Sequence, residues 1–315
     1  MIEVSELAKY YGDFTAVENV TFRAEKGEIL GFLGPNGAGK TTTMRMLTCF
    51  LPPSGGRASV AGFDVVDESM EVRKRIGYLP EQPPVYNDMT VQSYLRFVAK
   101  IKGVSSAGLK GAVDGVMEKV GLTDRRDSVI GHLSKGYRQR VGLGQALVHE
   151  PDVLILDEPT VGLDPNQIIE IREVIKGLKG DHTIILSTHI LSEVSMTCEK
   201  VVIINNGRIV GEGTPESLTA QMREGEVLRA QISGPTESVE GVLRSIEGVV
   251  DVVLEGAAEA DGDQVYLVTS QPDRDIREQL VRKLVENGFA LKELRALDIT
   301  LEEVFRRLTT EEVVV

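Results

Sequence analysis

Residues Gly34 to Thr41 place three glycines, a lysine and a threonine at the spacing GxxxxGK[ST]. Glycines let backbone N–H groups turn inward around phosphate oxygens, the lysine reaches terminal phosphates, and the threonine hydroxyl is a ligand for Mg²⁺. An ordinary glycine-rich turn could match the same letters, but it would not require a strand before it and a helix after it. We expect the phosphate contacts to come from Gly34, Asn36, Gly37, Gly39, Lys40, Thr41 and Thr42, with Thr41 also on the metal.

A second group of chemically capable residues lies far downstream. Val153–Leu156 is continuously apolar, as expected of a parallel strand covered on both faces. Asp157 and Glu158 follow at once, and open α/β sheets bind ligands at the carboxyl ends of their strands. We expect Asp157 to hold Mg²⁺ through water and Glu158 to polarise the attacking water. Without the phosphate-binding loop, the same pair could equally be a solvated strand exit.

The elements that must position these residues flank the loop. Ile29–Leu33 is a buried-strand run, and Thr42–Phe50 is predicted as a helix whose N-terminal dipole adds to anion binding. The sequence has no Asn-Lys-x-Asp segment of a guanine-specific GTPase and no GxGxxG of a kinase loop or dinucleotide site. The residues alone therefore predict an α/β, magnesium-dependent nucleoside triphosphatase.

Residues 133–140, with the sequence LSKGYRQR, resemble the LSGGQ signature of ABC-type ATPases. The resemblance implies that Ser134 and Gly136 face the γ-phosphate of ATP, at the start of a helix whose dipole favours that charge. Two positions depart from the signature, because Lys135 replaces a glycine and Tyr137 replaces a glutamine. The departures affect the detailed ribose or phosphate contact more than the recognition of ATP itself.

Other motifs match the same family in order and spacing. Tyr11 matches the aromatic residue that stacks on adenine, and Gln82 matches the loop glutamine that senses Mg²⁺ and takes part in catalysis. Residues 161–165 resemble the loop that contacts a second subunit, which places Asp164 near the nucleotide. His189 matches the switch histidine that contacts the γ-phosphate. Each residue alone would more often be structural, and it is their joint order that indicates function.

The resemblance covers residues 2–220 and implies a fold as well as a site. It predicts an ABC-type ATPase core in domain 1–220, with an antiparallel β subdomain and a helical subdomain at about 83–132. One phosphate-binding loop and one signature imply a head-to-tail dimer with a second copy of the chain, because each signature closes over ATP held by the other subunit. ATP and Mg²⁺ are the implied cofactors.

Signatures like this one resemble those of bacterial exporter ATPases in the gliding-motility, drug and polysaccharide export group. The resemblance implies an ATP-hydrolysing subunit of an export complex, held at the inner face of the cell membrane by separate integral-membrane permease subunits. The alternative is a soluble ABC-type ATPase that remodels or regulates a non-transport complex. Translation-associated relatives carry two cassettes and DNA-repair relatives carry long coiled-coil insertions, and the sequence shows neither feature.

Composition bounds the partners and the compartment. The 315 residues carry 35 basic and 48 acidic side chains, which gives a net charge of -13 and argues against nucleic acid as a partner. No apolar stretch approaches 18 residues, and the N-terminus does not resemble a signal peptide, so we expect a cytoplasmic protein. Residues 226–315 hold 19 acidic and 10 basic side chains, or -9, which leaves 29 and 25, or -4, for residues 1–225.

The acidic part forms a second predicted domain, 226–310, after a seam at 219–226. Alternating apolar residues predict strands at 227–232, 249–254, 264–269 and 290–295, and helices at 236–246 and 274–287. This order predicts a small α+β, ferredoxin-like domain of accessory function. A last helix, Leu301–Leu308, is expected to pack on that domain, and the segment TLEEVF that begins at Thr300 resembles the accessory tail of some exporter ATPases.

Overall fold

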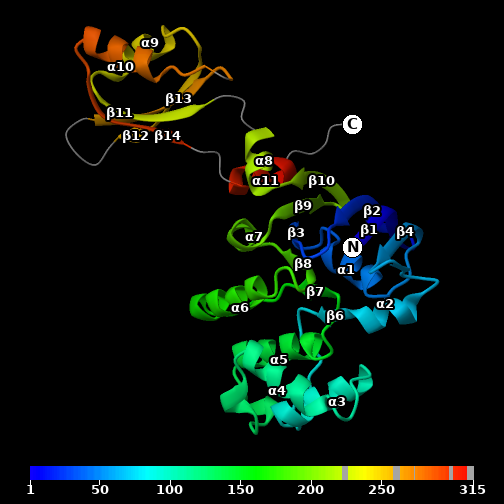
Figure 1. Cartoon of the computed structure of the whole chain (residues 1–315). Helices are drawn as coiled ribbons and strands as arrows, with labels where there is room; N and C mark the ends of the chain where they lie inside the picture. The colour runs from blue at the N-terminus through cyan, green and yellow to red at the C-terminus, as the bar shows by residue number, and fades with distance from the viewer. Residues whose placement is uncertain (222–225, 258–262, 273, 298–300, 311–315) are drawn as a thin grey trace. The chain divides into compact units, whose positions relative to one another are not determined.

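The structure is a computed structural model that describes residues 1–221, 226–257, 263–272, 274–297 and 301–310 (Figure 1). The chain divides into two compact units, which are described separately. The first comprises Met1–Pro215 together with the chain from Phe305 onward, and the second comprises Glu216–Val304. The predicted seam residues 222–225 and Thr300 lie outside the described residues.

A six-stranded sheet forms the centre of the first unit, in the order β10-β9-β3-β8-β7-β6. Every neighbouring pair is parallel except β9 and β10. The three strands β3, β7 and β8 are buried along their whole length, which confirms the apolar runs predicted for the first two. Their bounds are β3 (Ile29–Leu33), β6 (Ile76–Leu79), β7 (Val153–Asp157), β8 (Thr183–Thr188), β9 (Lys200–Asn205) and β10 (Arg208–Gly213).

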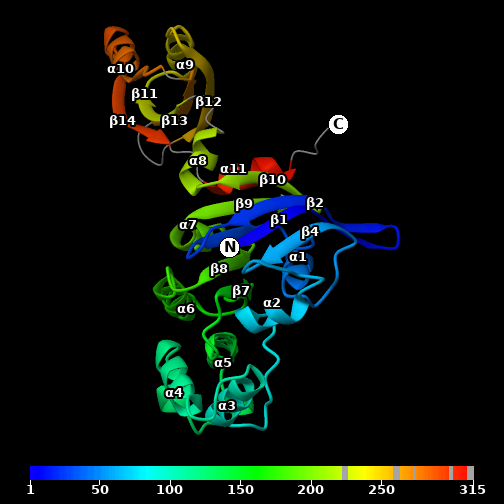
Figure 2. The same ribbon diagram turned by 45° about the vertical axis from the view of Figure 1, so that its right-hand side comes forward.

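An antiparallel sheet in the order β2-β1-β4-β5 packs beside the central sheet (Figure 2). Side chains of both sheets share one buried core, in which the Phe22 and Phe32 rings lie 5.4 Å apart between centroids. Burial of large aromatic rings from both sheets stabilises the junction between them. The strands are β1 (Ile2–Tyr11), β2 (Phe14–Ala24), β4 (Gly55–Val60) and β5 (Phe63–Asp64).

The helix after the phosphate-binding loop, α1 (Lys40–Leu47), begins two residues earlier than predicted and ends three residues sooner. Gly39 has a φ of 104°, so the left-handed loop conformation stops there and Lys40 is the first helical residue. Cys49 also has a positive φ, of 57°, which ends the helical path before Phe50. The phosphate-binding loop therefore passes into the N-terminus of α1 at Lys40, where the positive end of the helix dipole lies.

Three helices, α3, α4 and α5, pack on one another beyond the β6 and β7 end of the central sheet (Figure 1). Thr90 caps α3 by accepting a hydrogen bond from the Ser93 N–H, and Ser134 caps α5 in the same way. The remaining helices of the first unit lie between its strands in the chain. The bounds are α2 (Ser69–Arg75), α3 (Val91–Ile101), α4 (Leu109–Lys119), α5 (Lys135–Leu147), α6 (Pro165–Gly177) and α7 (Leu191–Thr197), with short 3₁₀ turns at Thr123–Arg125 and Ile130–His132.

The second unit follows the predicted order of strand, helix, strand, strand, helix, strand. Its sheet runs β12-β13-β11-β14 with every pair antiparallel, and α9 and α10 contribute Val239, Leu243 and Leu280 to its core. The second helix begins at Arg277 rather than 274, with the buried Ile276 as its N-cap residue. The bounds are α8 (Pro215–Gln221), β11 (Val227–Ser233), α9 (Thr236–Arg244), β12 (Val249–Ala257), β13 (Asp263–Ser270), α10 (Arg277–Glu286) and β14 (Ala290–Leu297).

The last helix, α11 (Leu301–Thr310), corrects part of one prediction. We expected it to pack on the C-terminal domain through Leu301, Val304, Phe305 and Leu308. Its residues up to Val304 group with the second unit, but from Phe305 onward the chain groups with the first. The side chain of Asn205, at the end of β9, donates a hydrogen bond of 3.3 Å to the Thr309 carbonyl oxygen. An amphipathic pattern shows that a helix has an apolar face but not which unit covers it.

No helix within the described ranges is both long enough and apolar enough to cross a membrane.

Candidate nucleotide-binding site

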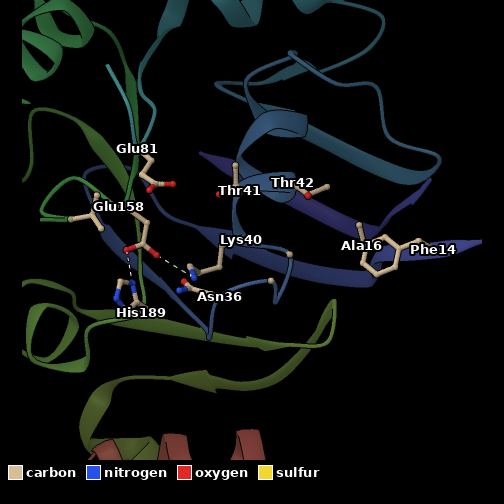
Figure 3. Close-up of a pocket in the computed structure, with 12 residues that line it drawn as sticks. Phe14, Ala16, Asn36, Lys40, Thr41, Thr42, Glu81, Glu158 and His189 are labelled. Carbon is tan, nitrogen blue, oxygen red and sulfur yellow. Dashed lines mark hydrogen bonds and ion pairs between the residues drawn. The ribbon is translucent and has the colours of Figure 1, made fainter. Parts of the chain in front are cut away.

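A cavity of about 490 Å³ lies at the carboxyl ends of β3 and β7, beside the phosphate-binding loop (Figure 3). Cavities of this size accommodate small molecules and cofactors. Eight of the predicted site residues meet there, and four further residues join them. The lining comprises Phe14, Ala16, Asn36, Gly37, Gly39, Lys40, Thr41, Thr42, Glu81, Glu158, Val161 and His189.

The loop keeps its shape because its glycines occupy positions where a side chain would collide. A Cβ atom at Gly34 would lie 2.4 Å from the Ile204 carbonyl oxygen, and one at Gly39 would lie 2.7 Å from the Ala16 carbonyl oxygen. Lys40 is buried, and its ammonium donates to the carbonyl oxygens of Gly34 at 2.8 Å and Pro35 at 3.2 Å. The lysine is therefore folded back over its own loop, at the start of α1.

Glu158 lies between two cationic or proton-bearing groups. Its Oε1 is 3.2 Å from Lys40 Nζ and its Oε2 is 2.8 Å from His189 Nδ1 (Figure 3). Only 6% of Glu158 is exposed, and its φ of 51° is a left-handed conformation that non-glycine residues rarely adopt. Such strain is typical of functional sites, where the surrounding structure holds the residue in place. The carboxylate can accept a proton from a water held against a bound phosphate.

Asp157 is fully buried at the end of β7. Its Oδ1 accepts a hydrogen bond from the Ser187 hydroxyl, whereas its Oδ2 has no hydrogen-bond partner. Burial raises the pKa of this carboxyl group, and the hydrogen bond from Ser187 opposes that rise. A buried carboxylate oxygen without a donor is suited to a cation or to a water bound on one.

Oxygen atoms dominate the possible metal ligands of this site. The described residues contain no cluster of three or more His, Cys, Asp and Glu side chains arranged to hold a metal ion. A cation here would instead combine the Thr41 hydroxyl with a few carboxylates and the phosphates of the nucleotide. That donor set fits Mg²⁺, which binds through one or two carboxylates and substrate phosphates.

The structure places Glu81, and not Gln82, in the nucleotide cavity. The Glu81 carboxylate is turned toward Thr41 (Figure 3). Gln82 lines a second cavity of about 390 Å³ together with Lys135 and the buried Gln139, and Glu81 and Val161 line both cavities. The two residues are neighbours in an irregular loop after β6, and the role predicted for Gln82 stays a prediction. The family resemblance indicated Gln82, and the sequence analysis did not single out Glu81.

Tyr11 does not line this cavity, and its predicted role in stacking on adenine stays a prediction. Tyr11 on β1 is paired with Phe14 on β2 across a two-residue turn, and it is Phe14 that lines the cavity. Both rings are accessible, with 46% of Tyr11 and 64% of Phe14 exposed. The tight turn at Gly12 could have signalled this pairing, because it sets residues 11 and 14 opposite each other.

The predicted signature and loop residues lie outside this cavity. Ser134 caps α5, and Asp164 caps α6 by accepting a 3.0 Å hydrogen bond from the Gln167 N–H. Gly136 is buried against the Gln167 side chain, which a Cβ atom would approach to 2.5 Å. Ser134, Gly136 and Asp164 therefore lie close to one another around Gln167, and none of them lines the cavity that holds Lys40.

The sequence profile of the ABC transporter family matches residues 17–161. The chain is 34% identical to the linearmycin resistance ATP-binding protein LnrL of Bacillus subtilis (strain 168), over 81% of this chain and 82% of that one. It is also 34% identical to the bacitracin transport ATP-binding protein BcrA of Bacillus licheniformis, over 98% of this chain and 97% of that one. A solved structure of the ATP-binding subunit of an ABC transporter superposes with a TM-score of 0.65 at 34% identity, covering 70% of this chain and 92% of that chain. These matches and the site show that the chain belongs to the ABC transporter family, as an ATP-binding subunit that hydrolyses ATP to drive transport.

Proposed function

We propose that two copies of this chain close head to tail on ATP, and that this closure powers export through separate permease subunits. The observation that carries the proposal is the separation of the predicted site residues into two surfaces. Lys40, Glu158 and His189 meet in one cavity, whereas Ser134 and Gly136 lie outside it. A second copy, turned head to tail, supplies the missing signature to the ATP held by the first.

Within each site, the phosphates of ATP take over the Lys40 ammonium from Glu158. The Glu158 carboxylate then orients and deprotonates the attacking water, and His189 hydrogen-bonds the γ-phosphate. Thr41, Asp157 and Glu81 would hold Mg²⁺, which would neutralise charge on the phosphates. Glu81 takes the place that the sequence assigned to Gln82, because it is Glu81 that shares the cavity with Thr41.

Exposed apolar side chains support a membrane-protein partner. Phe50, Tyr86 and Ile101 are 70%, 52% and 67% exposed, and Phe50 lines a cavity of about 430 Å³ together with Tyr78 and Pro84. Large exposed apolar groups of this kind mark protein interfaces. A permease docked here would hold the chain at the inner face of the membrane. The names of the two relatives support an antibiotic or a similar compound as the exported cargo.

The second unit is proposed to be a ferredoxin-like accessory domain. Its strand order, β12-β13-β11-β14, and its entirely antiparallel pairing support that topology. The described residues of this unit contain no cluster of His, Cys, Asp and Glu arranged to hold a metal ion. The chemistry therefore belongs to the first unit.

The catalytic role is tested with Glu158→Gln. The amide cannot accept the proton of the attacking water, so phosphate release should fall about 100-fold or more while ATP binding persists. Size-exclusion chromatography with ATP and Mg²⁺ should then show a trapped dimer. Lys40→Ala should lose ATP binding and remain monomeric. Near-normal turnover by Glu158→Gln would refute the assigned role of Glu158.

The head-to-tail geometry is tested by mixing two inactive variants, Lys40→Ala and Gly136→Asp. In a head-to-tail dimer, one composite site carries both defects and the other is intact, so the mixture should recover ATPase activity. If each copy used its own signature, every site would carry one defect and the mixture would stay inactive.

Coupling to a membrane partner is tested by affinity purification of the tagged chain from detergent-solubilised membranes. Recovery of a stoichiometric integral-membrane protein supports export. Recovery of soluble partners alone would support the alternative, a soluble ATPase that remodels another complex.

A further inference from the structure

Glu193 on α7 is a buried acidic residue outside the nucleotide cavity. Only 3% of it is exposed, and no ion pair to it is found among the described residues. A buried carboxylate without a cation is costly unless both of its oxygens receive hydrogen bonds. What donates to Glu193 therefore determines what it does.

Two threonine hydroxyls from different strand ends donate to this carboxylate. The Thr160 hydroxyl donates to Oε1, and the Thr188 hydroxyl donates to Oε2 at 2.7 Å. Both threonines are buried. Thr188 Oγ1 also accepts a 3.0 Å hydrogen bond from the Ile190 N–H, which fixes its rotamer. Glu193 thus joins the chain after β7 to the last residue of β8.

The two joined segments carry the residues assigned to hydrolysis. Thr160 follows Glu158 by two positions, and Thr188 immediately precedes His189. The Glu158 carboxylate and the His189 ring are themselves 2.8 Å apart. The two segments are therefore linked twice, once through the hydrogen bonds of Thr160 and Thr188 to Glu193, and once through the hydrogen bond between Glu158 and His189.

The strand ends alone do not impose this geometry. The Glu158 N–H donates to the Ser187 carbonyl oxygen at 3.0 Å, which aligns the backbones of β7 and β8. Glu158 leaves the sheet in a left-handed conformation, with a φ of 51°. Charge-assisted hydrogen bonds from buried hydroxyls are short and directional, so they can hold both exits in one arrangement.

We propose that Glu193 is a positioning residue, which acts through Thr160 and Thr188 to hold Glu158 and His189 in register for ATP hydrolysis. The inference rests on the proposed roles of Glu158 and His189. Glu193 itself does not line the nucleotide cavity, so it serves the hydrolysis step and not the binding of ATP.

The test compares Glu193→Ala with Glu193→Gln. The alanine variant releases both threonines and should lower kcat by about 10- to 100-fold, whereas the dissociation constant for ATP should stay within about twofold. The glutamine variant keeps one acceptor and gains one donor, so it should recover most of kcat. Ser195→Ala, on the same helix but exposed, is the matched control. Thermal melting of each variant monitors folding.

A second comparison separates positioning from general damage. In the Glu158→Gln background, Glu193→Ala should lower the residual rate by no more than about twofold, because residues that act as a unit are not additive. An equal loss of kcat in both backgrounds, a parallel loss of ATP binding, or no loss in Glu193→Ala would each overturn the proposal. Should Glu193→Ala fail to fold, Thr160→Val and Thr188→Val remove the two contacts one at a time. For each variant, kcat should fall while the dissociation constant for ATP stays nearly unchanged.

This outcome can be told apart from a failure of the proposed function. If Glu158→Gln itself turned over normally, the role of Glu158 would be wrong whatever the Glu193 variants did. If Glu158→Gln were inactive and Glu193→Ala were fully active, the proposed function would stand and the positioning role would fall.

Discussion

Three acidic residues at the nucleotide cavity have different surroundings, and their charges are compensated differently. Glu158 contacts Lys40 and His189, so its charge is paired before a nucleotide arrives. Asp157 is buried with one oxygen that has no hydrogen-bond partner. Glu81 faces Thr41 across the cavity. Each carboxylate therefore responds differently to substitution, to pH and to a cation.

Asp157→Asn should stabilise the nucleotide-free protein at neutral pH. Burial raises the pKa of Asp157 in the folded state, so ionisation costs stability once the pH exceeds the unfolded value of about 3.9, and the cost grows through the raised folded pKa. The amide removes that cost, and the melting temperature at pH 7 should rise by about 2–4 °C per kcal/mol gained. The gain should shrink in acid. Stabilisation by ATP with Mg²⁺ should be weakened in the same variant, and an unchanged melting temperature would contradict the argument.

Glu81→Gln should shift the dependence on Mg²⁺. Without the cation, the Glu81 carboxylate repels the phosphates, so the amide should bind ATP about two- to fivefold more tightly. With the cation, a carboxylate is the better ligand, and the variant should need a higher Mg²⁺ concentration for half-maximal ATP binding. Equilibrium binding at several Mg²⁺ concentrations measures both effects. Gln82→Ala is the comparison, and a larger shift there would favour the residue that the sequence indicated.

The residue scale shows where pattern reading succeeds and where it stops. The loop from Gly34 to Thr41 has fixed spacing, and all of its residues that were predicted to contact the nucleotide line the cavity except Gly34. Glu81 and Phe14 were missed because each stands near a residue of a more suggestive type. Which side chain of a near pair enters a cavity depends on local backbone direction, which spacing does not encode.

At the scale of elements, α5 follows the signature residues at its N-terminus and packs against β6. The signature residue Ser134 is its N-cap, and the helix ends two residues before His149. The His149 Nε2 donates to the Ile76 carbonyl oxygen of β6 at 3.0 Å, while its Nδ1 is buried without a partner. The arrangement suits a neutral imidazole, and burial lowers the pKa of His149 to about 4. The contact between α5 and β6 is therefore sensitive to acid.

His149→Gln should make the protein less sensitive to acid. A histidine with a folded pKa below its unfolded value of about 6.5 gives full stability above that pH and loses it as the pH falls toward 4. Glutamine can keep the donor to Ile76 and cannot be protonated, so its melting temperature relative to the natural protein should rise by roughly 2–5 °C between pH 7 and pH 5. His132→Gln, at an exposed position, is the matched control. Parallel melting curves over this range would count against the assignment.

The predictability of elements depended on how completely they are buried. Strands β3 and β7 were placed correctly because both faces are covered and their residues are continuously apolar. The limits of α1 were missed because positive φ angles at Gly39 and Cys49 decide them. Glycine at such a position can be anticipated, but a left-handed cysteine is imposed by its surroundings.

At the scale of the whole molecule, the chain leaves its first unit and later returns to it. Residues 226–315 hold most of the net charge, -9 of -13, so an acidic accessory domain was foreseeable from composition. The return of the chain at Phe305 was not foreseeable, because the apolar face of α11 suits a partner in either unit. The C-terminal end is thus part of the ATPase unit, although it lies about 90 residues beyond it in sequence.

Two truncations with the same missing domain should therefore behave differently. Ending the chain after Pro215 removes the accessory unit and also the α11 residues that group with the ATPase, including the hydrogen bond from Asn205 to Thr309. Replacing residues 216–304 by a Gly/Ser linker removes the accessory unit and the first four residues of α11, but keeps the chain from Phe305 onward. We expect the linker variant to have a melting temperature close to that of the ATPase unit in the intact chain, and to bind ATP normally. The shorter chain should melt several degrees lower, since about 1 kcal/mol corresponds to 2–4 °C for a domain of this size.

The same pair of variants locates the role of the acidic charge. Because the linker variant keeps the ATPase unit whole, any partner, oligomeric state or ATPase response that it loses depends on the accessory unit and its negative surface. Screening weakens contacts between exposed charges, so a partner held by that surface should also dissociate from the intact chain as salt rises from 0.05 to about 0.5 M. If the linker variant retained every partner and every response, the accessory unit would have no regulatory role. Equal melting temperatures of the two truncations would show that α11 does not stabilise the ATPase unit.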